Sequence, residues 1–296
     1  MHFLMRLIFK TFFIVALNFC SVAFSLGTNF LLFPESASAM ALGRHPSLGG
    51  SESVNPALIE QRNDSPMFHI NSGSWFGNIN LAGLNYIQRS GNYNNRFFIR
   101  HADVTDLELR DNSPSDNPIS KFSAYAFQLG VGVSRGNKFG NFGMMLSYLS
   151  LGIYDQKADG FSMDIGYSRL LSNDFGLGVS VLNLGYMSKF YQDRPELPIS
   201  IVAGISKQVD LYRLKNNIYL TTEYFTKELP MKFKIGADMQ WGQLNFLAGY
   251  SITKFDAEFS VGGGLKYGRF KVIYATRFGS QEIGEPKIFS INYRML

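Results

Sequence analysis

The side chains that most often carry catalysis or bind metals are few in this sequence and widely spaced. Only four histidines occur in the chain, and the last three are His45, His69 and His101. Zinc sites use histidine and cysteine ligands at characteristic close spacings, which these residues lack. A serine hydrolase would need a serine, a histidine and an orienting polar group to converge, and no spacing singles out such a set. We therefore expect no enzymatic activity, no metal site and no cofactor.

Two further patterns have a structural interpretation. The glycine run from Val261 to Gly264 is not a phosphate-binding loop, because no helix follows it. It lies within a strand-like pattern, where glycine makes room for a bend or for the close approach of another backbone. Asp164 and Asp238 occupy the polar phase of alternating segments, so their role depends on the elements that position them.

The dominant pattern after Met67 is an alternation of apolar and polar residues, which is the period of a β-strand. In the last segment, Phe289, Ile291 and Tyr293 alternate with Ser290 and Asn292. Several segments contain apolar exceptions on the polar face, namely Met145, Leu149 and Leu247. Turn residues between the segments divide the chain into fourteen expected strands, at 67–75, 78–88, 93–104, 122–135, 139–153, 160–171, 174–184, 197–209, 216–226, 230–240, 243–253, 255–266, 269–277 and 286–295.

These strands predict an all-β fold, a closed antiparallel transmembrane β-barrel of about 14 strands over residues 67–296. Single-chain bacterial barrels have an even number of strands, and nine to eleven tilted residues cross a bilayer. The composition agrees, since glycine (29), phenylalanine (27) and tyrosine (15) are abundant and only 17% of residues are charged. A soluble β-sandwich is the alternative, but it would leave long sheet edges with few charges to protect them.

The N-terminal residues 1–25 predict a signal peptide. Arg6 and Lys10 precede an apolar stretch, and Ala23 and Ser25 supply small residues for cleavage. The alternative is an uncleaved membrane anchor. Cleavage would remove the single cysteine and lower the net charge from +5 to +3. Because no run of basic residues is present, we expect no nucleic-acid partner. The predicted location is the outer membrane of a diderm bacterium, with the lipid bilayer as the first partner.

Residues 26–66 do not alternate and predict a plug, or hatch, within the barrel. They contain many small residues, paired glycines and the element Asn55, Pro56, Ala57 and Leu58. The alternative is a flexible periplasmic tail. If the plug lies in the lumen, lumen-facing Asp164 and Asp238 could pair with Arg44, Arg62 or His45, and Asp164→Asn would then raise channel conductance. A solvated lumen charge without a special role is the other interpretation.

With these elements in place, the sequence resembles the PorV/PorQ family of outer-membrane barrels, which are accessory proteins of type IX secretion and related to FadL-type barrels. The similarity runs from about residue 30 to 295. It rests on the order of weak motifs, at 30–43, 55–58, 74–75, 122–125, 155–166, 182–185, 197–198 and 203–205.

The resemblance implies a non-enzymatic protein that assists secretion or surface attachment of cargo proteins. Long polar loops at 106–117 and 185–196 are the expected contact surface. A FadL-like passive transporter of hydrophobic small molecules is the alternative, and a scaffold barrel with a fully occluded lumen is a third possibility.

Overall fold

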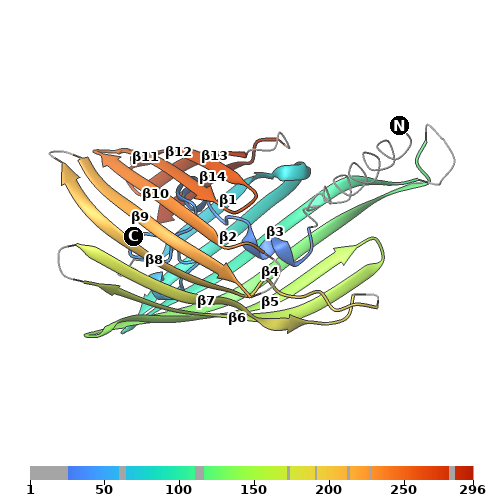
Figure 1. The fold of residues 1–296 in the computed structure, drawn as a ribbon, viewed down its shortest axis with the longest axis horizontal. Helices are drawn as coiled ribbons and strands as arrows, with labels where there is room; N and C mark the ends of the chain where they lie inside the picture. The colour runs from blue at the N-terminus through green and yellow to red at the C-terminus, as the bar shows by residue number, and fades with distance from the viewer. Residues whose placement is uncertain are drawn as a thin grey trace, which may run out of the picture.

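The computed structural model describes residues 26–59, 65–110, 117–171, 174–190, 192–211, 214–226, 229–279 and 284–295. The predicted signal peptide and Arg62 lie outside these residues. Fourteen antiparallel strands form one closed barrel, in which each strand pairs with its sequence neighbours and β1 pairs with β14 (Figure 1). The strands are β1 (Met67–Trp75), β2 (Ile79–Ser90), β3 (Tyr93–Leu109), β4 (Ser120–Asn137), β5 (Gly140–Ile153), β6 (Gln156–Leu170), β7 (Phe175–Met187), β8 (Ser200–Leu211), β9 (Leu214–Phe225), β10 (Lys232–Trp241), β11 (Leu244–Ile252), β12 (Ala257–Tyr267), β13 (Phe270–Gly279) and β14 (Lys287–Arg294).

The fold class, the strand count and the ring closure are therefore confirmed. The β1–β14 seam runs from Met67 opposite Arg294 to Ser74 opposite Lys287. This seam pairs the strand edges that an open sheet would leave free, which is what a lipid environment requires, because lipid cannot hydrogen-bond to exposed backbone.

The outward phase of the strands is apolar. Leu146 on β5, Ile205 on β8 and Phe246 on β11 are each 42 to 48% exposed, which would be costly over a whole surface in water but is favourable against lipid tails. Aromatic pairs lie at the strand ends that carry the short turns, for example Phe142–Tyr167 and Phe270–Tyr293, with ring centroids 4.9 and 4.8 Å apart. Together with the closed ring, this apolar belt identifies an outer-membrane barrel.

The two ends of the barrel differ in their connections. Two residues join β2 to β3, β4 to β5, β10 to β11 and β12 to β13 at one end, and β1 begins and β14 ends there too. Bacterial barrels carry short turns on the periplasmic side, so we call this the periplasmic end and the opposite one the outer end. One connection at the outer end, Tyr154–Asp155, also has only two residues.

Two strands extend into segments that the sequence analysis assigned to loops. β3 continues to Leu109, past a β-bulge between Val104 and Leu107 where Asp106 has a φ of 59°. β7 continues to Met187, past a register shift beside Asn183, which has a φ of 60°. The predicted loop starts at 106 and 185 were wrong, because a bulge lets a strand continue through a residue that interrupts the alternation.

The N-terminal segment contains a 3-10 helix η1 (Thr28–Leu32), a short helix α2 (Ala37–Leu42) and a second 3-10 helix η2 (Pro56–Leu58); a third, η3 (Phe76–Asn78), follows β1. No helix among the described residues is long and apolar enough to cross a membrane. The segment is drawn in blue within the ring of strands in Figure 1. The ring of strands is called the wall below. α2 contacts β10 to β14, and η2 contacts β4 to β6, on another part of the wall.

Candidate functional site

The described residues 26–59, called the plug below, run through the lumen from the outer end to the periplasmic end. Near the outer end, the Thr28 hydroxyl donates to the Glu196 carbonyl at 2.7 Å, and the Phe33 ring lies 5.1 Å from that of Trp75. Near the periplasmic end, the Ser134 hydroxyl donates to the Ile59 carbonyl. This segment therefore contacts the strands near both ends of the barrel.

Helix α2 is fitted closely to the wall. The Ser36 hydroxyl caps it by accepting from the Ala39 amide at 3.2 Å. The Ala37 amide, in the first turn of the helix, donates to Ser290 Oγ at 2.8 Å, and Ser260 Oγ donates to the Ala41 carbonyl at 2.9 Å. A Cβ added at Gly262 would lie 2.8 Å from that of Ala41, so this glycine makes room for the plug.

The element Asn55, Pro56, Ala57 and Leu58 forms η2 and its cap at the periplasmic end. Asn55 Nδ2 donates to the carbonyls of Pro46 at 2.7 Å and Tyr167 at 2.9 Å, and its Oδ1 accepts from the Ala57 amide at 3.0 Å. Asn55 is fully buried. Its side chain therefore joins two parts of the plug to β6, a positioning role that asparagine can fill because it both donates and accepts.

Glycines on the wall permit this contact. A Cβ at Gly166 would overlap Asn55 Oδ1, and one at Gly143 would overlap the Pro56 backbone. The pairing of these two glycines across β5 and β6 forms a flat seat for η2.

His45 anchors the middle of the plug. Its ring stacks on Tyr219 at 4.9 Å, and its Nε2 lies 2.6 Å from the Leu42 carbonyl, which can only accept. Nε2 therefore carries the proton, and Nδ1 accepts from the Thr221 hydroxyl at 2.8 Å. Burial, together with the positive charge of Lys234, lowers the pKa of His45 to about 3, so this histidine is neutral.

A buried ion pair joins the plug to β3. Glu35 accepts from Arg96 Nη2 at 2.9 and 2.8 Å, and their side chains are 5% and 0% exposed. Arg96 also donates to Asn85 and lies over the Phe98 ring at 4.4 Å. Arg100 donates to the Phe33 carbonyl at 2.9 Å, with its Nε 3.9 Å from Glu35. The wall thus places two arginines around one carboxylate of the plug.

A second buried ion cluster lies on β9, β10, β12 and β13. Lys234 Nζ is 2.6 Å from Glu223, and Glu258 receives Lys232 Nζ at 2.7 Å. Arg277 Nη1 lies 3.5 Å from Glu258, and its guanidinium lies 5.0 Å from the centre of the Trp75 ring. These ion pairs link strands of the wall beside α2.

Asp164 and Asp238 lie on inward-facing positions but are not brought together. The Asp164 carboxylate accepts from the Asn183 amide at 2.6 Å, at the register shift between β6 and β7. Among the described residues it forms no ion pair with Arg44 or His45, although Arg44 lines the same cavity of about 20 Å³. Asp238 accepts from Asn245 Nδ2 and borders a polar cavity of about 810 Å³ toward the periplasmic end.

The outer part of the lumen is apolar along β1 to β7, whereas the buried ion cluster of Lys232, Glu258 and Arg277 lies at the outer ends of β10, β12 and β13. Phe30, Leu31 and Phe33 of the plug belong to one buried cluster with wall residues such as Trp75 and Leu149. Leu81, Val104, Leu107, Phe190 and Ile199 pack against it and are only partly buried. At the outer end the plug therefore covers this apolar side, called the apolar mouth below, and toward the periplasmic end it borders a polar cavity.

The buried ion pairs could not be predicted from the sequence, because charged residues on a polar strand face look like solvated lumen charges. The apolar exceptions on that face were visible in the sequence, but their role was not. Met145 packs against Ile59, while Leu149 and Leu247 join the cluster around α2. An apolar residue on the lumen face thus marks where the plug touches the wall.

Within the described ranges, no group of three or more histidine, cysteine or acidic residues could hold a metal ion. The other two histidines lie beside carboxylates, with Nδ1 of His69 3.7 Å from Glu52 and Nδ1 of His101 3.5 Å from Asp103.

The solved structures that match this fold include a toluene transporter and a monoaromatic hydrocarbon channel. The Pseudomonas putida (P. putida) toluene transporter TodX matches with a TM-score of 0.62 and 12% identity, over 89% of this chain and 99% of that one. The monoaromatic hydrocarbon channel CymD matches with a TM-score of 0.61 and 12% identity, over 88% and 96%. At this identity the likeness establishes the fold. No protein-family model and no curated protein matches the sequence.

Proposed function

We propose that this barrel admits hydrophobic small molecules through the outer membrane, with the plug as the gate. The observation that carries the proposal is the apolar lining of one side of the outer mouth. A pore for polar solutes needs a hydrated entrance, whereas here aromatic and aliphatic side chains from β1 to β7 cover the plug on that side. Binding sites for hydrophobic ligands have such a lining.

The fold supports the same proposal. TodX and CymD, whose folds match this one, are described as a toluene transporter and a monoaromatic hydrocarbon channel. For the present chain we therefore propose a small aromatic or aliphatic solute. Its entry surface would include the partly buried side chains of Leu81, Val104 and Leu107.

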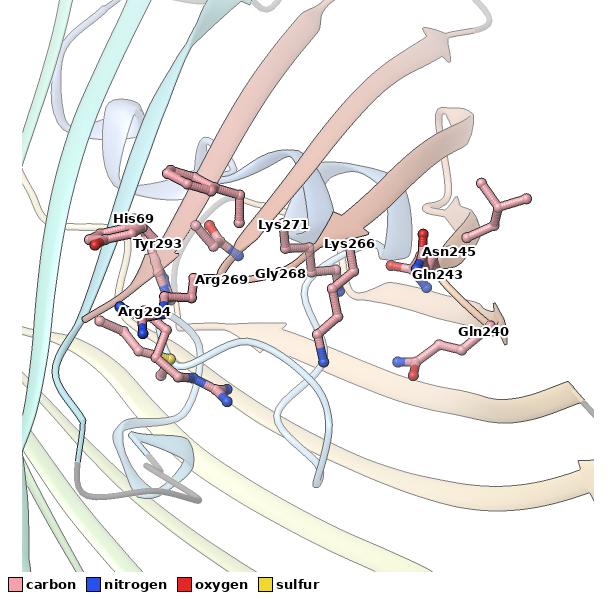
Figure 2. Close-up of a pocket in the computed structure, with 15 residues that line it drawn as sticks. His69, Gln240, Gln243, Asn245, Lys266, Gly268, Arg269, Lys271, Tyr293 and Arg294 are labelled. Atoms are coloured by element: carbon pink, nitrogen blue, oxygen red, sulfur yellow. The ribbon is translucent and has the colours of Figure 1, made fainter. Parts of the chain in front are cut away.

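Passage requires the plug to shift, so some of the contacts that hold it must break. Within the described residues, hydrogen bonds, two arginine contacts and apolar packing hold it. Beyond it lie a polar cavity of about 810 Å³ and a second cavity of about 430 Å³ (Figure 2) toward the periplasmic end. A solute that displaced part of the plug would therefore leave an apolar site for a hydrated space.

Uptake of radiolabelled toluene by bacterial cells lacking their own hydrophobic-solute channels tests the proposal. Cells that produce the protein should show a faster initial rate than cells with an empty vector, and the rate for a sugar should be unchanged. Leu81→Asn, which places an amide in the mouth, should slow toluene uptake. Leu109→Asn, on the outer rim of β3, is the matched control. Equal toluene rates with and without the protein would refute the proposal.

The resemblance to PorV/PorQ supports a second proposal, in which the outer surface binds secreted cargo proteins. One of the loops expected to make contact, between β7 and β8, is tied to the mouth by the Thr28–Glu196 hydrogen bond and by buried Leu197. Deleting the gene would impair cargo secretion and surface anchoring if this proposal holds. Intact secretion and anchoring would refute it.

A further inference from the structure

Trp75 lies where the apolar mouth meets the buried ion cluster. It ends β1 at the outer end of the barrel and is 6% exposed. The ring centroids of Phe33 and Phe76 lie 5.1 and 5.3 Å from that of Trp75. The guanidinium of Arg277, which belongs to the ion cluster, lies 5.0 Å from the centre of the same ring. Trp75 therefore borders both an apolar and a polar environment.

The indole N–H of Trp75 has no acceptor. Its Nε1 atom is buried, and no hydrogen-bond partner for it is found among the described residues. Indole can only donate, and the N–H group of a buried tryptophan usually has a partner. Because a buried donor without an acceptor destabilises the folded protein, an acceptor supplied by a bound molecule would be favourable here.

The neighbours of Trp75 cannot fill this role. The two phenylalanine rings carry no oxygen or nitrogen, and the guanidinium of Arg277 has donors only. Glu258, the carboxylate beside Arg277, already accepts from Lys232 at 2.7 Å and from Ser251 at 2.9 Å. A water molecule at Nε1 would need further polar partners, which the two rings do not offer.

Phe33 shows what kind of group fits against Trp75. Its ring is tilted by 30° from the indole, an arrangement within the range of stabilising aromatic pairs. Phe33 belongs to the plug, so movement of the plug would uncover the indole, and the aromatic ring of a solute could take the place of Phe33. Because the N–H bond lies in the plane of the indole, its acceptor must lie at the edge of the indole. A solute ring with an acceptor on a short substituent meets both requirements.

We propose that the apolar mouth takes aromatic molecules that carry a neutral hydrogen-bond acceptor on a substituent, such as aromatic ketones, and that Trp75 Nε1 donates to this acceptor. This selectivity rests on the proposed entry of hydrophobic molecules and names the class that the mouth prefers. Ligand sites are largely apolar, with a few polar groups that fix orientation, and Trp75 supplies both. A charged acceptor would have to give up its hydration among apolar side chains, which is costly, so a neutral one is favoured.

NMR of the indole tests the hydrogen bond directly. The chain has two tryptophans, and the second, Trp241, lies at the periplasmic end of β10 and is 56% exposed. In full-length Trp241→Phe in detergent, the one indole N–H signal belongs to Trp75. Acetophenone should shift this proton signal downfield in a saturable way, because the ketone oxygen accepts from it. α-Methylstyrene has the same shape with a methylene group in place of the oxygen and should shift the signal much less. Equal shifts from the two compounds, or none from either, would overturn the proposal.

Uptake by cells that lack their own hydrophobic-solute channels measures the selectivity. The quantity compared is the ratio of the initial rates for acetophenone and α-methylstyrene, each corrected for the empty vector. Trp75→Phe keeps an aromatic ring but removes the donor, so it should lower this ratio about two- to tenfold, the effect of one net hydrogen bond. Trp241→Phe is the matched control and should leave the ratio unchanged. An unchanged ratio in Trp75→Phe would contradict the role of Nε1.

The two experiments separate this selectivity from the proposed function. Uptake of both compounds with no indole shift and an unchanged ratio would refute the role of Trp75 and leave hydrophobic transport standing. A saturable shift caused by acetophenone but not by α-methylstyrene, without uptake of either compound, would support the binding site and refute transport. The NMR measurement keeps Trp75 itself, so it does not depend on the folding of Trp75→Phe.

Discussion

Replacing Glu35 by Gln should loosen the plug. The carboxylate of Glu35 is the acceptor for two bonds of 2.8 and 2.9 Å from Arg96, and it lies 3.9 Å from Arg100. Glutamine preserves the size of the side chain but removes its charge. The two arginines of the wall would then lose their nearest counter-charge, while Arg96 stays buried.

The magnitude follows from burial. Breaking a buried ion pair by removing one partner costs about 3–5 kcal/mol, and about 1.4 kcal/mol corresponds to a tenfold change in an equilibrium. The ratio of seated to displaced plug should therefore fall by a factor of at least about 100. In planar bilayers this predicts frequent openings in the variant and rare ones in wild type.

Glu108→Gln is the matched control. Glu108 pairs with Arg110 at 2.7 Å, but the two side chains are 39% and 48% exposed, so the pair contributes about 0–1 kcal/mol. The variant Glu35→Gln/Arg96→Gln should recover part of the lost stability, because it also removes the buried charge of Arg96 and leaves only Arg100 without its partner Glu35. Identical conductance and melting of Glu35→Gln and Glu108→Gln would refute the assignment of this pair as the principal charged anchor.

Three further predictions concern the wall and the plug. Gly166→Ala should lower the melting temperature, because the added Cβ would overlap Asn55 Oδ1. Gly263→Ala is the control and should leave the melting temperature unchanged, because nothing lies within 4 Å of its new Cβ. Equal melting temperatures of the two variants would contradict the close contact of η2 with β5 and β6. Asp164→Asn should leave the channel conductance near the wild-type value, because the asparagine oxygen can still accept from the Asn183 amide and no ion pair with Arg44 is broken. A large increase in conductance would support the hypothesis that Asp164 pairs with Arg44 or His45. The pKa of His45 is lowered from 6.5 to about 3, so the folded state stays neutral at a pH where the unfolded state binds a proton. The protein should therefore lose about 1.4 kcal/mol of stability per pH unit as the pH falls from 6.5 toward 3. His45→Gln should flatten the pH dependence of the melting temperature in this range, and identical slopes would argue against a buried neutral histidine.

The barrel could be predicted from the sequence because its signal is local. A strand that faces lipid on one side and the lumen on the other must alternate, so fourteen strands were found with ends a few residues from those observed. The bulge at Asp106 and the register shift at Asn183 were not predictable in this way, since each depends on how neighbouring strands pair.

The contacts of the plug are long-range and therefore harder to infer. Glu35 meets Arg96, 61 residues away, and Ala37 meets Ser290, 253 residues away. Nothing in the spacing of single residues encodes such pairs. The partial signals were the glycines on the wall and the inward apolar residues Met145 and Leu247, which mark the places where the plug approaches.

A disulfide between the plug and the wall tests the central claim, that plug movement admits hydrophobic solutes, most directly. Cysteines at Ala41 and Gly262 would have Cβ atoms 2.8 Å apart, so about 1 Å of separation would bring them to the about 3.8 Å of a disulfide. In cells that carry this variant with Cys20→Ser, toluene uptake should be low when the pair is oxidised and should return to the wild-type rate on reduction. Full uptake with the disulfide intact would show that solutes pass without movement of the plug, and would contradict the account.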